Sequence, residues 1–298
     1  MSSLTALVTG GAGLLGQYLN RALAERFHVV SWYHAHPRDA ADYDGEPVDF
    51  NEESSIEEAF ERATPDVVVH TAAISSVGAA ETQPRRYVYD VNVRATERLA
   101  LLCELNGARM IYTSTDLVYA GDRGSFLDES SKISPLSIYA ETKYMGEEKI
   151  RRTVEDRLVL RLALLYGFGL GETTCHFETM YQALREGERP KLFTDQWRTP
   201  LALHDAARMI AELAANSEAT GKTINLGGKE RLSRYELGER LCDIADLNAD
   251  LLDPTRMNDV PDLPQVADVS MSIEALRSLG VEPKSVEESI RDILGNNY

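Results

Sequence analysis

The chain has 298 residues, of which 43% are hydrophobic and 27% are charged, and its formal net charge at pH 7 is −17. This length allows a sizeable core in one large domain, or in a domain with a smaller lobe. The negative charge would repel phosphate backbones and anionic lipid, which argues against nucleic-acid and membrane partners.

The N-terminal residues and the cysteines indicate the compartment. No stretch approaches the roughly 18 consecutive apolar residues of a membrane span, and residues 1–4 carry neither a basic region nor a cleavage signature. We therefore predict a cytoplasmic protein. The chain has three cysteines, Cys103, Cys175 and Cys242. Because their number is odd and they lie far apart without the spacing of metal ligands, we expect reduced, structural thiols and no metal site.

The first predicted elements are a strand, a glycine turn and a helix. Leu4 to Thr9 is an apolar run rich in strand-forming residues, and Leu15 to Arg26 has helical periodicity. The glycines between them fit both G-x-G-x-x-G and G-x-x-G-x-x-G, a turn whose backbone N–H groups receive a pyrophosphate at the helix N-terminus. We predict dinucleotide binding by Gly10, Gly13, Leu14, Leu15 and Gly16.

The end of the second strand, His28 to Trp32, bears on the choice of cofactor. An acidic side chain there would accept from the ribose 2′-hydroxyl and repel a 2′-phosphate. Tyr33 and His34 occupy that place, with Arg38 just beyond. This favours NADP, although NAD stays open because an aspartate at position 39 or 42 could fold back to the ribose.

The next segments carry further candidates for the cofactor site. Asp49 and Phe50 are candidates for the adenine pocket, and a helix capped by Ser54 or Ser55 follows them. The apolar run Val67 to His70 suits a buried parallel strand. Small residues come after it and let backbone approach a ligand, so we assign Ala72 and Ala73 to the cofactor and Ser75 to the substrate.

A long helical pattern runs from Pro84 to Asn106. Asn92 lies within it and is assigned to the cofactor site, with a buried, hydrogen-bonded structural asparagine as the alternative. The strand Met110 to Thr113 follows and leads into Thr115 and Asp116, at the carboxyl end where open α/β sheets bind ligands. We assign both residues to the substrate, with ordinary turn chemistry as the alternative.

Tyr139 and Lys143 stand four residues apart in a predicted helix that a loop of about twenty residues separates from Thr115. Side chains at this spacing share one helix face. A phenol with an unperturbed pKa of about 10 is a poor proton donor at neutral pH, and a nearby cation favours the phenolate. We predict Tyr139 as the general acid/base and Lys143 as the cation, against the alternative of a solvated helix face.

The apolar strand Leu158 to Leu165 closes an alternation of strands and helices that implies a parallel, doubly wound, Rossmann-like sheet. We divide the chain into a dinucleotide-binding domain, residues 1–166, and a smaller C-terminal substrate lobe, residues 167–298, with some segments returning to the sheet. The later predicted elements are a helix over 173–185, a strand over 190–193, a turn over 195–200, a helix over 203–215, a strand over 222–226, a Ser233-capped helix over 234–245, and tail segments over 272–279 and 285–294.

These motifs together resemble the extended short-chain dehydrogenase/reductase family over nearly the whole chain. Residues 114–121 and 135–143 look most like the dTDP-4-dehydrorhamnose reductase group. The resemblance implies that Thr115 polarises a substrate carbonyl, that Tyr139 passes the proton and that Lys143 binds the nicotinamide ribose while tuning Tyr139. It also implies substrate roles for Trp197 and Arg198, and pairing of two copies through the helices near Tyr139, that is, a homodimer.

The resemblance predicts an NAD(P)-dependent reductase of a nucleotide-linked keto sugar, as in dTDP-rhamnose biosynthesis. Leu164 stands where rhamnose-forming reductases tend to place a sugar-contacting tryptophan, so the particular sugar stays open. A nucleotide-sugar epimerase or dehydratase is one alternative, although Leu117 replaces the second acid that dehydratases use. The other alternative is a non-catalytic, cofactor-binding regulatory subunit, like that of methionine adenosyltransferase.

Overall fold

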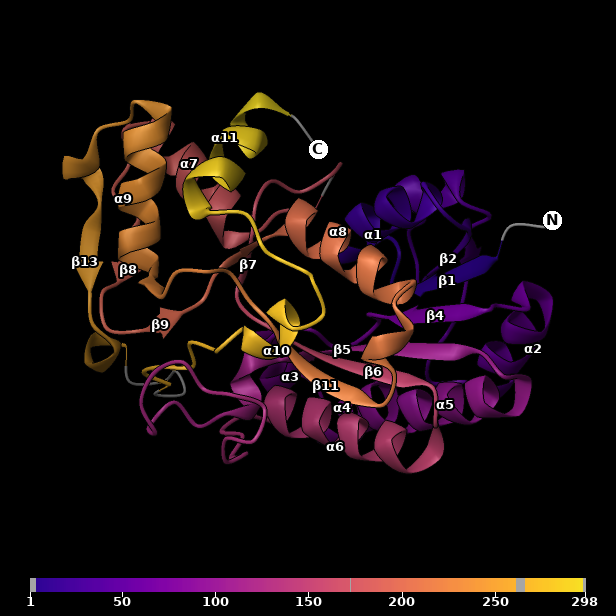
Figure 1. The fold of residues 1–298 in the computed structure, drawn as a ribbon. Coiled ribbons are helices and arrows are strands. Elements are labelled where there is room, and N and C mark those ends of the chain that lie inside the picture. The colour runs from indigo at the N-terminus through magenta and orange to yellow at the C-terminus, as the bar shows by residue number, and fades with distance from the viewer. Residues whose placement is uncertain (1–3, 172, 261–265, 297–298) are drawn as a thin grey trace.

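The computed structural model describes residues 4–171, 173–260 and 266–296. Its central sheet has seven strands in the order β11-β6-β5-β4-β1-β2-β3, and every neighbouring pair is parallel (Figure 1). The predicted parallel, doubly wound sheet is therefore confirmed. The strands are β1 (Thr5–Thr9), β2 (His28–Tyr33), β3 (Glu46–Pro47), β4 (Val67–His70), β5 (Arg109–Thr115), β6 (Arg157–Leu162) and β11 (Lys222–Leu226).

Helices cover both faces of the sheet (Figure 1). One face carries α1 (Leu14–Ala24) and α8 (Leu203–Ala214), and the other carries α2 (Glu53–Ala63), α5 (Ala95–Asn106) and α6 (Ile138–Thr153). Leu15, Leu19 and Leu23 recur every four residues on α1 and are buried in the core. Each such leucine contributes about 1.5–3 kcal/mol of burial free energy. The helical stripe and the apolar strands thus explain the layered arrangement.

The strand order places the ligand-binding edge. From β1 the chain adds β2 and β3 on one side and β4, β5 and β6 on the other. At such a reversal the loops leaving two neighbouring strands turn to opposite faces, and a crevice opens beyond their carboxyl ends. Here the two strands are β1 and β4, so the glycine turn and the segment after His70 lie side by side.

Several boundaries differ from the expectation. The predicted helix over 84–106 consists of α4 (Arg85–Tyr89), a π-helical turn (η2, Asp90–Arg94) and α5. α2 begins at Glu53, so the predicted cap by Ser54 or Ser55 is wrong: the Ser55 hydroxyl instead accepts from the Asp49 N–H at 3.1 Å. The elements that were not predicted include β3 and α3 (Val77–Thr82), because each is too short to show periodicity.

The later part of the chain builds a smaller layered unit beside the sheet (Figure 1). It contains α7 (His176–Arg185), α9 (Arg234–Ala245) and α11 (Val286–Gly295), which share one apolar cluster. Ser233 caps α9 as predicted, in a capping box with Glu236. The short strands are β7 (Leu165–Tyr166), β8 (Lys191–Phe193), β9 (Trp197–Arg198), β10 (Leu201–Ala202), β12 (Leu232–Ser233) and β13 (Asp253–Thr255), and α10 (Glu274–Arg277) packs near β11.

Within the described ranges, no helix has the length and apolar character needed to cross a bilayer. The same ranges hold no group of three or more His, Cys, Asp or Glu side chains that could bind a metal ion. Cys103, Cys175 and Cys242 are free thiols.

Candidate active site

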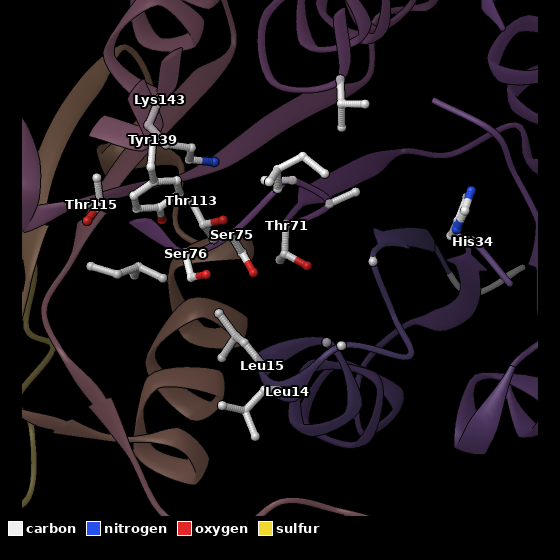
Figure 2. Close-up of a pocket in the computed structure, with 18 of the residues that line it drawn as sticks. Leu14, Leu15, His34, Thr71, Ser75, Ser76, Thr113, Thr115, Tyr139 and Lys143 are labelled. Atoms are coloured by element: carbon white, nitrogen blue, oxygen red, sulfur yellow. The ribbon is translucent and has the colours of Figure 1, made fainter. Parts of the chain in front are cut away.

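A cavity of about 820 Å³ lies along the carboxyl edge of the sheet, at the reversal between β1 and β4 (Figure 2). Its volume falls within the range of about 300–1,000 Å³ that is usual for ligand pockets. Most of the predicted site residues line it: Gly10, Gly13, Leu14, Leu15, Gly16, Tyr33, His34, Arg38, Asp49, Phe50, Ala72, Ala73, Ser75, Thr115, Asp116, Tyr139 and Lys143. The glycine turn and the predicted catalytic residues, which lie far apart in the sequence, therefore line the same cavity.

The glycine turn forms one wall of the cavity and is shaped for backbone approach. Gly10 has φ +69°, a left-handed conformation that favours glycine. A Cβ at Gly16 would stand 2.2 Å from the Gly10 carbonyl oxygen, so close packing of α1 on the turn requires glycine there. Gly13 has an ordinary φ of −78° and leads into α1. The turn thus presents the N-terminus of α1 to the cavity, which fits a dinucleotide pyrophosphate.

A buried hydrogen-bond chain fixes the opposite wall, the segment after β4. The Thr9 hydroxyl accepts from the N–H groups of Thr71 (3.1 Å) and Ala72 (3.2 Å), so its own hydrogen goes to His70 Nδ1 at 2.7 Å. His70 therefore carries its hydrogen on Nε2 and donates to Thr96 Oγ1 at 2.9 Å. Burial and the Lys143 charge lower the pKa of His70 to about 3, so the ring stays neutral.

The other end of the cavity holds the predicted catalytic residues. Ser137 caps α6 by accepting from the Ala140 N–H at 3.2 Å, and this places Tyr139 in the first turn and Lys143 in the second. Both side chains point from α6 toward the cavity, and Thr115 approaches Tyr139 from the end of β5 (Figure 2). Thr115, Tyr139 and Lys143 therefore lie at the same end of the cavity, although a loop separates Thr115 from the other two residues in the sequence.

The protonation of this group differs from the prediction in one respect. Lys143 was expected to lower the pKa of Tyr139. Instead, burial and the Asp116 carboxylate raise the pKa of the Tyr139 phenol to about 12, while a hydrogen bond with Thr115 opposes this. Burial lowers the pKa of Lys143 itself to about 7, with Glu147 acting in the opposite direction. Tyr139 is thus a protonated donor at neutral pH.

Asp116 is a buried carboxyl group beside Thr115. Its Oδ1 accepts from the Thr115 hydroxyl at 3.2 Å, and its Oδ2 faces Arg198 Nε at 3.5 Å. Burial raises the pKa of Asp116 to about 6, and the Arg198 charge limits the rise. The Thr115 hydroxyl also accepts from the Leu117 N–H at 3.2 Å, so its single hydrogen, donated here to Asp116, would have to turn away from Asp116 to reach a bound oxygen.

The far end of the cavity is formed by the residues that follow β2 and β3. His34 lies there, well away from Tyr139 (Figure 2). Arg38 has φ +46° and donates to the Ala12 carbonyl at 2.8 Å, so its guanidinium lies against the glycine turn. The Phe50 ring stacks on His70 with centroids 5.8 Å apart. This end offers the Arg38 guanidinium and an aromatic face to an adenosine moiety.

Asp39 does not line this cavity. It borders a smaller adjoining cavity of about 440 Å³, which also contacts Arg21, His36 and Arg38. The alternative acceptor for a ribose hydroxyl is therefore separated from the main pocket, whereas His36 and Arg38 line both.

Three predicted site residues do not line the cavity. Asn92 is 1% exposed; its Oδ1 accepts from the Ile74 N–H at 2.8 Å and its Nδ2 donates to Thr142 Oγ1 at 3.1 Å. It supports the walls, as its structural alternative implied. Trp197 stacks under the Arg231 guanidinium, 4.3 Å from the ring centroid. Arg198 contacts the site through its ion pair with Asp116.

Arg234, by contrast, lines the cavity and was not among the predicted residues. It is the first residue of α9, next to the Ser233 cap, and within the described part of the chain it forms no hydrogen bond or ion pair. Burial and the like charge of Arg198 lower its pKa, and Asp116 acts in the opposite direction. The sequence predicted that α9 begins after the Ser233 cap, but no local sequence pattern indicated that this helix start lies at the cavity.

Comparison with known proteins gives one family. The model described as RmlD substrate binding domain matches residues 4–298. The chain is 29% identical over 259 residues to the "Probable low-salt glycan biosynthesis reductase Agl14" of Haloferax volcanii, with 86% of this chain and 85% of that one covered. It is 28% identical to the dTDP-4-dehydrorhamnose reductase of Escherichia coli, with 72% and 67% covered.

Other similarities bear on the alternatives. The chain is 26% identical to the methionine adenosyltransferase 2 subunit beta of Xenopus tropicalis, with 93% of this chain and 82% of that one covered. Among solved structures, a dTDP-4-dehydrorhamnose reductase from Bacillus anthracis, in complex with NADP, superposes with a TM-score of 0.86 at 23% identity and covers 99% of this chain and 100% of that one. That likeness shows the shared fold.

The glycine turn yields the first prediction. Gly13→Val should abolish dinucleotide binding, because the added side chain would occupy the space next to the N-terminus of α1. The fold should survive, since the φ of Gly13 is ordinary and a Cβ there meets only the Gly10 carbonyl oxygen, at 3.0 Å. Calorimetry with NADPH and a thermal melt would separate the two effects. Near wild-type affinity would mean that the turn is only a connector.

The second prediction concerns cofactor choice. Arg38→Gln removes the cation from the far end of the cavity while keeping a similar length. NADPH affinity should fall by about 1.5–3 kcal/mol, the usual worth of a hydrogen bond to a charged group, and NADH affinity should change little. Titration calorimetry with both cofactors checks this. Equal losses for NADPH and NADH would assign Arg38 to the shape of the turn rather than to a 2′-phosphate.

Proposed function

The chain belongs to the family of the RmlD substrate binding domain, and from this premise we propose that it reduces a keto sugar carried on a nucleotide, with NADPH as the preferred donor. It is an NAD(P)-dependent oxidoreductase of the extended short-chain dehydrogenase/reductase type. The observation that carries the proposal is the meeting of Tyr139, Thr115 and Lys143 at one end of a cavity whose other end is the glycine turn.

The protein's own groups supply the proton side of this reaction. A nicotinamide cofactor supplies a hydride to the carbonyl carbon when bound. Tyr139, protonated at neutral pH, donates its hydrogen to the carbonyl oxygen as charge develops there. The Thr115 hydroxyl donates a hydrogen bond to the same oxygen. The products are the hydroxyl sugar and the oxidised cofactor, and solvent returns one proton to Tyr139.

The rest of the cavity supports an anionic, sugar-bearing substrate. Arg234, which has no ion pair among the described residues, brings a cation to the lobe side of the pocket in a protein of net charge −17, and this suits the diphosphate of a nucleotide sugar. Ser75 and Asp116 line the same end and can bond sugar hydroxyls. Leu164 also lines the cavity where a tryptophan was expected for rhamnose-forming enzymes.

The alternatives differ in what they require. Leu117 lines the cavity where dehydratases use a second acid, so the site offers one carboxyl group, Asp116, at the strand end. A dTDP-linked 4-keto sugar is our first choice of substrate, on the similarity to the reductase of Escherichia coli. NADPH and NADH oxidation should be measured against a panel of nucleotide 4-keto sugars. Tight NADPH binding without reduction of any of them would favour a regulatory subunit.

The third prediction tests the chemical step. Tyr139→Phe removes the proton donor and keeps the ring, and Thr115→Val removes the hydroxyl at nearly constant volume. Each should lower kcat by about 100-fold or more, with NADPH affinity within a few-fold of wild type. Stopped-flow reduction and calorimetry measure the two quantities. Unchanged keto-sugar reduction in Tyr139→Phe would remove the assignment of Tyr139.

The fourth prediction concerns the substrate. Arg234→Gln should raise KM for the nucleotide sugar by about 10-fold or more, which is the loss of one charge-assisted hydrogen bond, and leave KM for NADPH unchanged. Arg231→Gln is the matched control, because Arg231 lies three residues away but pairs with Asp268 at 2.8 Å. An equal effect of both substitutions, or an effect on NADPH alone, would contradict a substrate role for Arg234.

A further inference from the structure

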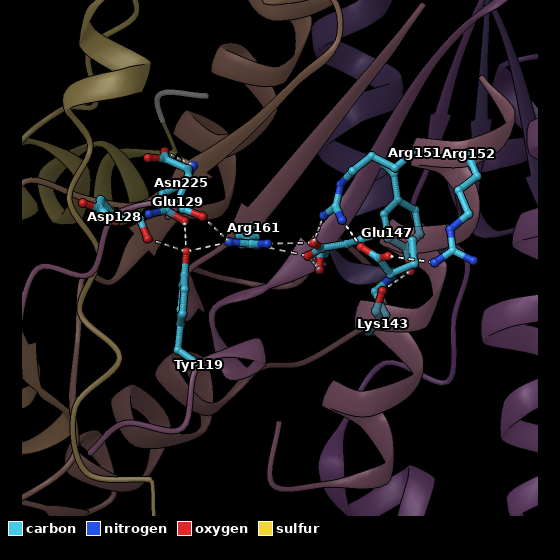
Figure 3. A network of polar contacts seen from close by, with 12 residues as sticks. Tyr119, Asp128, Glu129, Lys143, Glu147, Arg151, Arg152, Arg161 and Asn225 are labelled. Atoms are coloured by element: carbon cyan, nitrogen blue, oxygen red, sulfur yellow. Dashed lines mark hydrogen bonds and ion pairs between the residues drawn. The ribbon is translucent and has the colours of Figure 1, made fainter. Parts of the chain in front are cut away.

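Glu147 is a carboxylate buried one helical turn beyond Lys143. Its side chain is 0% exposed, and it is bound from three elements (Figure 3). Arg161 of β6 donates to it through Nε at 3.1 Å and Nη2 at 2.9 Å. Ser114 of β5 donates to Oε1 at 2.6 Å, and Arg151 of α6 donates to Oε2 at 2.9 Å. Glu147 is therefore fixed in place, in ion pairs with Arg151 and Arg161.

Lys143 lacks such a direct partner. It is 3% exposed, and within the described ranges it forms no ion pair. Its Nζ lies 4.1 Å above the centre of the Tyr112 ring, and Tyr112 OH donates to the Lys143 carbonyl at 3.3 Å. A buried ammonium is costly without an opposite charge. Some nearby group must therefore favour the charged form.

The groups around Lys143 come from three strands and its own helix. His70 on β4 is neutral, and burial raises the pKa of Tyr112 on β5 well above its ordinary value. Tyr139, on the same helix, is protonated at neutral pH. Arg161 on β6 is a cation. Among the described residues, Glu147 is the one anion that acts on the Lys143 ammonium, and it raises the Lys143 pKa against the effect of burial.

We propose that Glu147 is a positioning residue for the reduction: Arg161 and Ser114 hold its carboxylate one turn from Lys143, where it keeps Lys143 charged. The proposal rests on the function proposed above, in which a charged Lys143 contacts the nicotinamide ribose and faces the reacting end of the pocket. If the charge of Glu147 is lost, burial acts on the Lys143 ammonium without the attraction that opposes it.

The direct test is an NMR titration of the cofactor-free protein labelled with [13Cε]lysine. The chain has seven lysines, and Lys143→Arg identifies the Lys143 signal. In the wild type, Lys143 should titrate near pH 7, whereas exposed lysines titrate near about 10.4. Glu147→Gln should move the Lys143 midpoint down by about one pH unit or more. An unchanged midpoint would overturn the proposal.

Two further variants complete the test. Glu148→Gln is the matched control: Glu148 is the next residue, is 31% exposed and pairs with Arg151 and Arg152. It should leave the Lys143 midpoint within a few tenths of a pH unit of the wild-type value. Arg151→Gln removes a partly exposed cation that shares Glu147, so it should move the midpoint up. If Glu147→Gln does not fold, an unchanged or lowered midpoint in Arg151→Gln would overturn the proposal.

The kinetic consequence has a defined sign. Loss of the proton from Lys143 should end activity on the alkaline side, so the falling limb of kcat/KM for NADPH should shift to lower pH in Glu147→Gln and to higher pH in Arg151→Gln. Limbs that stay in place while the NMR midpoints move would show that Lys143 need not be charged, and would overturn the role in reduction. Because the NMR titration needs no substrate, failure of the proposed function would appear separately, as absent turnover in the wild type.

Discussion

The buried pair of Glu147 and Arg161 is the interaction that ties the site to the rest of the fold. It joins α6 to β6, and Ser114 adds the end of β5. On its other side, Arg161 donates to the Tyr119 hydroxyl at 2.9 Å, which in turn meets Asn225 of β11 at 3.0 Å (Figure 3). Removing one member of such a pair leaves an uncompensated buried charge and typically costs about 3–5 kcal/mol. Polar contacts thus join α6 to β5 and β6 directly, and to β11 through Arg161 and Tyr119, in addition to packing.

A second constraint is the reversal of strand order between β1 and β4. It opens the crevice in which the glycine turn faces the residues after β4. The hydrogen-bond chain from Thr9 through His70 to Thr96 shows how this crevice is kept rigid, because each hydroxyl hydrogen and ring nitrogen in it has one assigned partner. These polar groups bond to one another, so they shape the cavity wall and do not bind a ligand themselves.

Charge works on two scales in this protein. The overall charge of −17 opposes anions at long range, but such fields are screened over about 8–10 Å at physiological ionic strength. Local cations at the cavity wall act at much shorter distance. Arg38 stands at one end of the cavity and Arg234 at the other. Two anionic ligands, a dinucleotide and a nucleotide sugar, could therefore be held side by side in an acidic protein.

The sequence by itself determined the elements whose signals are local. The glycine turn after an apolar strand, the Ser233 cap and the spacing of Tyr139 and Lys143 each depend on neighbouring residues, and each lies where it was predicted. The parallel sheet followed from the alternation of strands and helices. Hydrophobic periodicity and capping chemistry act over one or two turns, so a single sequence records them directly.

Only the tertiary structure decided which side chains meet across the sheet. Arg234 lines the cavity whereas Asn92, Trp197 and Arg198 do not, because the packing of the later part of the chain and the π-helical turn set the positions of these residues. The Tyr139 pKa rises rather than falls because burial and Asp116 act on it, and both effects come from distant parts of the chain. The same is true of Glu147: its spacing from Lys143 is visible in the sequence, but Arg161 and Ser114 come to it only when β5 and β6 pair. Burial and charge pairing depend on three-dimensional distance, which no local pattern encodes.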